Sequence, residues 1–93
     1  MPKKVLVLGV EYKLLLKEGL MEREGCEGIT DLHEYTITID KSLVFKPKAF
    51  EKVYWHEVAH AFAHETGLHE VLDEQGREMF AQTFSVFMCS QKD

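Results

Sequence analysis

The chain has 93 residues, of which 45% are hydrophobic and 29% are charged. This composition excludes an intrinsically disordered chain and predicts one folded domain over residues 1–93. The net charge of −5, with no clear basic patch, argues against a nucleic-acid partner.

The apolar N-terminal stretch does not fit a signal peptide or a membrane segment. MPKKVLVLGVEYK places lysines before an apolar run, but at about six residues that run is too short for a signal peptide. No segment approaches the roughly 20 apolar residues that a membrane span needs. Cys26 and Cys89 form no CxxC pair, which favours a reduced chain over a disulfide. We therefore expect a cytoplasmic protein with no membrane partner, and we make no prediction about its oligomeric state.

The first half of the chain predicts short strands. Residues 3–16, KKVLVLGVEYKLLL, read as two strands or as one strand bent at Gly9. Residues 17–31 carry three glycines and many charges, which favours loop or turn. Residues 33–40, HEYTITID, alternate between Tyr35, Ile37 and Ile39 on one face and polar residues on the other. This alternation is typical of a half-buried strand.

The second half predicts two helices. The first spans about residues 48–66, after Pro47, and ends at Gly67 as a C-terminal cap. The second spans about residues 73–89. Its expected buried stripe consists of Phe80, Phe84, Phe87 and Met88. The order of elements predicts an α+β fold, with a small antiparallel sheet of about three strands packed on two helices.

The first helix contains the motif HExxH at His56-Glu57-Val58-Ala59-His60. Residues four apart lie one turn apart on the same helix face, so both imidazoles can bind one metal ion. Glu57 points about 100° away, where it can reach a water on that ion without binding the ion itself. The motif therefore predicts a zinc site with His56 and His60 as ligands and Glu57 as general base.

A metal-free helix with histidines on its solvent face is the simplest alternative. Apolar residues on the neighbouring face place His56 and His60 at the edge of the core, where an unpartnered imidazole would be costly. His64 lies one turn beyond His60, about 12 Å along the axis from His56 at 1.5 Å per residue. All three histidines therefore cannot bind one ion, and we place His64 at the rim of the site.

The third protein ligand is the open choice, and three patterns compete for it. In metzincins the third ligand is a histidine six positions after the second histidine of HExxH, and a glycine lies between them. This chain has Thr66 at the position of that histidine and Ala63 at the position of that glycine. In SprT-like proteins it is a histidine in a downstream HG pair, but here Glu70 follows His69. In gluzincins it is a glutamate on the next helix, which Glu78 satisfies 18 positions after His60.

Glu74, one turn before Glu78, is the competing glutamate. The small residues Ala81 and Ser85 follow Glu78 on the same side of the helix and would let the two helices approach closely. We therefore assign Glu78 as the third ligand and keep Glu74 and His69 as alternatives. The glutamate that does not bind the ion could orient a ligand histidine instead.

These motifs resemble a known family over about residues 28–90. The segments ITDLHEYTITIDKSL, YWHEVAHAFAHETGL and EQGREMFAQTFSVF are similar to small metallopeptidase-like proteins of bacteriophages and prophages, relatives of the ImmA/IrrE-type gluzincins. The resemblance implies a minimal zincin with Zn²⁺ as cofactor. In that family the glutamate precedes an Ala-Asn-x-Phe-Ala run. Here Phe80-Ala81 matches, but Arg77-Glu78 replaces Ala-Asn, and this alignment favours Glu74.

The sequence thus leads to a zinc-dependent metallopeptidase acting on a peptide or protein substrate. An extended peptide would pair with the edge of the strand at residues 36–40. An oxyanion stabiliser is also needed, and the candidates are Tyr54, His64, His69 and Arg77. The rival is a zinc-binding interaction or regulatory module without proteolysis, which the small size favours and the intact Glu57 opposes. A metal-free helical regulator is a third reading.

Overall fold

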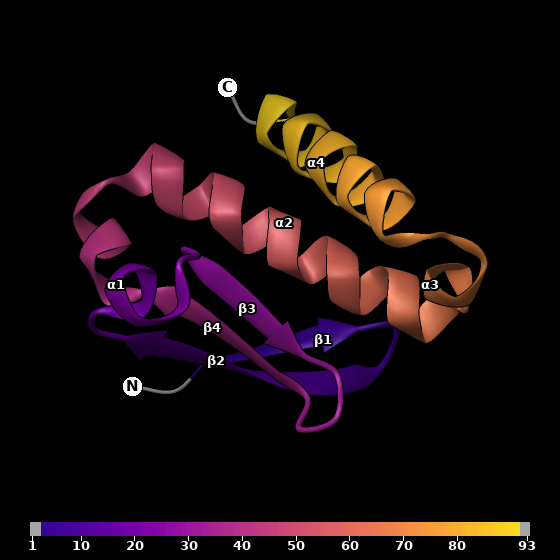
Figure 1. Ribbon diagram of the computed structural model, residues 1–93, viewed down its shortest axis with the longest axis horizontal. Coiled ribbons are helices and arrows are strands. Elements are labelled where there is room, and N and C mark those ends of the chain that lie inside the picture. The colour runs from indigo at the N-terminus through magenta and orange to yellow at the C-terminus, as the bar shows by residue number, and fades with distance from the viewer. Residues whose placement is uncertain (1–2, 92–93) are drawn as a thin grey trace.

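The computed structural model describes residues 3–91, so the ends of the predicted domain 1–93 lie outside the described residues. Within this range the chain forms one mixed sheet of four strands, four α-helices and a 3-10 helix (Figure 1). The strands are β1 (Lys3–Val7), β2 (Val10–Lys17), β3 (Gly28–Asp31) and β4 (Thr36–Asp40). The helices are α1 (Leu20–Glu24), η1 (Lys41–Phe45), α2 (Pro47–Thr66), α3 (Leu68–Val71) and α4 (Glu74–Ser90).

The first two strands form a hairpin, as one of the two sequence interpretations predicted. Val7 pairs with Val10, which leaves only Leu8 and Gly9 in the turn. Both turn residues have positive φ, 52° at Leu8 and 84° at Gly9, which is the backbone of the tight turns that match strand twist. Gly9 therefore marks a chain reversal and not a bend within one strand.

The prediction of an α+β fold is confirmed, but the antiparallel three-stranded sheet is wrong in detail. The strand order is β1-β2-β4-β3, and β2 pairs with β4 in parallel, whereas β3 and β4 are antiparallel. The additional strand, β3, and the helix α1 both come from residues 17–31, which we expected to be loop. Each is too short for its periodicity to show in the sequence.

Asp40 explains how the segment before β3 becomes ordered. It ends β4, is buried, and accepts hydrogen bonds from the backbone N–H of Met21 in α1 and of Ser42 in η1, each at 3.0 Å. The bond from Met21, followed by that from Ser42, holds the pKa of this carboxyl below its usual range. We expected Asp40 on the polar face of its strand, but it joins α1 to the sheet.

The core lies between the sheet and α2. Ile37 and Ile39 of β4 are fully buried there, as their alternation predicted, and Val58 and Ala61 cover them from α2. Tyr35 does not belong to β4: it lies in the preceding turn with φ 56° and is exposed. The first helix matches its predicted range and ends at the cap residue Gly67.

α4 packs on α2 on the side away from the sheet, so only one long helix covers the sheet directly (Figure 1). Its fully buried side chains are the small ones, Ala81 and Ser85, while Phe80 and Phe84 are half-buried against Phe62. Phe87, which we predicted to be buried, is 58% exposed because its side of α4 faces away from α2. Among residues 3–91, no helix has the length and apolar character needed to cross a membrane.

Candidate metal centre

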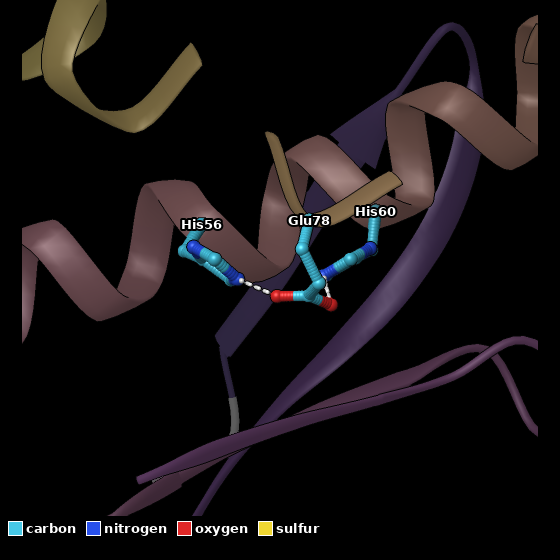
Figure 2. A group of neighbouring side chains, drawn as sticks. All are labelled: His56, His60 and Glu78. Atoms are coloured by element: carbon cyan, nitrogen blue, oxygen red, sulfur yellow. Dashed lines mark hydrogen bonds and ion pairs between the residues drawn. The ribbon is translucent and has the colours of Figure 1, made fainter. Parts of the chain in front are cut away.

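The two histidines of the HExxH motif lie on one face of α2. Their ring centroids are 5.1 Å apart, as expected for positions one helical turn apart. Both side chains are largely buried, with 22% exposure for His56 and 18% for His60. Figure 2 shows the two rings extending from the helix with their Nε2 atoms converging on one point.

The carboxylate of Glu78, which belongs to α4, lies between the two rings (Figure 2). Its Oε1 lies 3.2 Å from Nε2 of His56, and its Oε2 lies 3.2 Å from Nε2 of His60. One ligand atom from each of the three residues can be chosen so that all lie within 4.8 Å of one another. Among residues 3–91, this is the one group of histidine, cysteine and acidic side chains close enough to hold a metal ion.

The two alternative ligands stand apart from this group. Glu74 lies in the first turn of α4, directly after the N-cap residue Asp73, whose carboxylate accepts from the N–H of Gly76 at 2.7 Å. His69 lies on the short helix α3. The structure thus brings Glu78, and neither Glu74 nor His69, against the two histidines.

Contacts between α2 and α4 explain why Glu78 arrives at this place. The hydroxyl of Ser85 donates to the backbone oxygen of Lys52 at 2.7 Å, which requires close approach of the two helix backbones. Ala81 lies between Glu78 and Ser85 and is fully buried, so no large side chain separates the helices. The two helices are antiparallel, because Glu78 lies beside His56 and His60 while Ser85 lies beside Lys52.

Glu57 is buried beneath the histidines, against β3. Its side chain packs beside Gly28, where an added Cβ would lie only 2.9 Å from Cγ of Glu57 and 2.7 Å from Cγ1 of Val53. The hydroxyl of Thr30 lies 2.6 Å from Oε1 of Glu57 and 3.0 Å from its backbone oxygen. The strand therefore fixes one carboxylate oxygen of the predicted base.

Sequence reasoning did not identify Gly28 and Thr30 as site residues. Both belong to the strand that we read as loop, and a GIT triplet carries no signal that points to a site. Only the packing of β3 on α2 places them beside Glu57.

A cavity of about 610 Å³ joins these features. His56, His60, Glu57 and Glu78 all line it, together with residues of β3, so the ligand group and the predicted base face the same space. In the described part of the chain β3 is one of the two edge strands of the sheet, whereas β4 lies between β2 and β3. The expectation that residues 36–40 offer a free edge to a peptide is therefore wrong, because β3 covers that edge.

The four oxyanion candidates lie in different places. His69 lines the cavity beside His56, His60 and Glu78, and Tyr54 lines a separate cavity between α2, α4 and the first two strands. Burial, and then the charge of Arg77, lowers the pKa of His69. Arg77 donates from Nε to the backbone oxygen of His69 at 2.9 Å, and the ring of His64 lies 6.1 Å from that of His69.

A scan of protein-family models, a search of curated proteins and a search of solved structures each found no match to this chain.

Proposed function

We propose that this chain is a zinc-dependent metallopeptidase of the gluzincin type, with His56, His60 and Glu78 as zinc ligands and Glu57 as general base. The observation that carries the proposal is the convergence of all four side chains on one cavity. The resemblance of the motif-bearing segments to ImmA/IrrE-type gluzincins supports the same class.

The donor set fits zinc in type and spacing. Two imidazoles and one carboxylate are a ligand set of catalytic zinc sites, which leave the fourth position to water. Ligand atoms about 2.1 Å from an ion at tetrahedral angles lie about 3.4 Å from each other. Each Nε2 lies 3.2 Å from a different oxygen of Glu78, which is close to this value, and one ligand atom from each of the three residues can be chosen so that all lie within 4.8 Å of one another.

The chain's own residues provide the remaining parts of the reaction. When bound, zinc would lower the pKa of a water molecule and polarise the substrate carbonyl. Glu57 takes the proton of that water and returns it to the leaving amine. Because Thr30 holds Oε1 of Glu57, Oε2 is the oxygen that accepts this proton. His69, which belongs to the lining of the same cavity, is the residue we assign to the developing oxyanion.

The substrate in this proposal is an extended peptide. β3 lies at the edge of the sheet and lines the cavity beside Glu57, so a peptide can add to the sheet as a further strand. We expect this activity in the cytoplasm, and the unpaired state of Cys26 and Cys89 supports that expectation.

Zinc titration and a peptide-cleavage assay on the wild type and Glu57→Gln test the proposal together. Zinc at a hundredfold excess over its Kd should stabilise both proteins by about 2.7 kcal/mol, visible as a higher melting temperature that a chelator reverses. The wild type should cleave peptides, and Glu57→Gln should not, since an amide cannot accept the proton of water at neutral pH.

Each part of the proposal can fail separately. If neither zinc nor a chelator changes the melting temperature, the proposed metal site is refuted. Zinc binding without cleavage by the wild type would favour the rival function, a zinc-binding interaction module.

A further inference from the structure

The metal-binding cavity extends along α2 in both directions from the ligand group. His69 lies towards one end, beyond His60, and Lys52 lies at the other, one helical turn before His56. Lys52 and the two ligand histidines are spaced by four residues, so they lie on one face of the helix. The exposed side chain of Lys52 has no ion-pair partner among residues 3–91.

α4 adds a second polar group at the same end. Glu78 lies beside the histidines, and Ser85, seven residues later, is bonded to the backbone of Lys52. Gln82 falls between these two points, one turn after Glu78, and lines the same cavity. An ammonium and an amide thus border one end of the cavity from two different helices. Glu27 belongs to the opposite wall, just before β3.

The direction of β3 determines which part of a bound peptide meets this end. Gly28 lies beside Val53 and Glu57, and Thr30 lies beside Glu57, so β3 runs in the same direction as α2 (Figure 1). Antiparallel pairing is the more stable kind of strand addition. A peptide paired antiparallel to β3 therefore runs from the His69 end towards the Lys52 end, with its C-terminal residues near Lys52.

We propose that Lys52, with Gln82, recognises a carboxylate on the C-terminal side of the bond that the metal centre acts on. Lys52 lies about 9 Å along the helix axis before the midpoint between His56 and His60, and an extended peptide advances about 3.4 Å per residue. The carboxylate would thus lie two to three residues beyond the bond, at about 3.4 Å per residue. It can be the peptide's own C-terminus or an Asp or Glu side chain. This inference rests on the proposed function, because it assumes that a peptide occupies the cavity.

Binding to the zinc-loaded Glu57→Gln protein tests the inference without turnover. The probes are short N-acetylated peptides in matched pairs: a free against an amidated C-terminus, and, in amidated peptides, Glu against Gln. We expect the carboxylate member of at least one pair to bind about fivefold more tightly, the size of an exposed ion pair, with a smaller gain at high salt. The pair that shows the gain identifies the source of the carboxylate.

The gain should disappear when Lys52→Gln is added and persist when Lys48→Gln is added. Lys48 is the matched control, because it is an exposed lysine one turn earlier on α2 that does not line the cavity. Equal affinity for carboxylate and amide peptides, or a gain that survives Lys52→Gln, would overturn the role of Lys52 and leave the proposed function standing. If none of the peptides binds, the proposal that this cavity binds a peptide is refuted, and the role of Lys52 is refuted with it.

Discussion

The hydroxyl of Thr30 lies 2.6 Å from Oε1 of Glu57 and couples the edge strand β3 to the predicted general base. A hydrogen bond to a buried carboxylate restricts its rotation, and here it engages Oε1 and not Oε2. The glutamate of the HExxH motif is therefore oriented by Thr30, which precedes Glu57 by 27 residues and lies outside the motif.

Thr30→Val removes this hydroxyl with little change in shape. We expect kcat for peptide cleavage to fall roughly tenfold, because a hydrogen bond to a charged group contributes about 1.5 kcal/mol. Zinc affinity should stay the same, since Thr30 does not touch the ligand group. Thr38→Val, on the neighbouring strand β4, is the control and should keep full activity. Unchanged activity in Thr30→Val would mean that Glu57 acts without this support.

Gly28→Ala tests the close contact between β3 and α2. The added methyl group would lie 2.7 Å from Val53 and 2.9 Å from Glu57, so the strand or the helix must shift. We expect a loss of about 1–3 kcal/mol in the free energy of unfolding, the usual cost of overpacking. Chemical denaturation measures this loss. A variant as stable as the wild type would show that β3 moves freely away from α2.

The identity of the third ligand follows from single substitutions on α4. Glu78→Ala should weaken zinc binding by more than roughly 100-fold, beyond the effect of residues that only support a ligand. Glu74→Ala is the matched control, with the same side chain removed one turn earlier, and it should retain near-normal affinity. Zinc titration of both variants shows which substitution weakens zinc binding more. If Glu74→Ala loses the metal and Glu78→Ala keeps it, the family-like alignment is correct and our assignment is wrong.

His69 should contribute to the reaction but not to zinc binding. Replacing one donor to an oxyanion typically lowers kcat by about 100-fold or more, so His69→Gln should reduce kcat strongly and KM little. His64→Gln is the control, because His64 is not part of the cavity lining. Tighter binding of a peptidyl phosphonate by the wild type than by His69→Gln would support the same role. Equal kcat in both proteins would exclude it.

The sequence by itself determined the features that depend on local spacing. The four-residue interval between His56 and His60 places both imidazoles on one face of any helix that contains them, whatever packs around it. Gly67 ends that helix because its backbone adopts φ 84°, which side chains disfavour. The alternation of Ile37 and Ile39 likewise predicted the buried face of β4, since successive strand residues point to opposite sides.

Only the tertiary structure decided which distant residues meet the motif. Glu74 and Glu78 are both glutamates on one helix, and the contact between Ser85 and Lys52 sets the position of α4 that brings Glu78 to the histidines. β3 forms because β4 offers it a partner and Asp40 orders the preceding helix, so its four residues carry no sufficient local signal. The place of Thr30 beside Glu57 follows from that pairing, since a side-chain contact across 27 residues depends on packing and not on spacing along the chain.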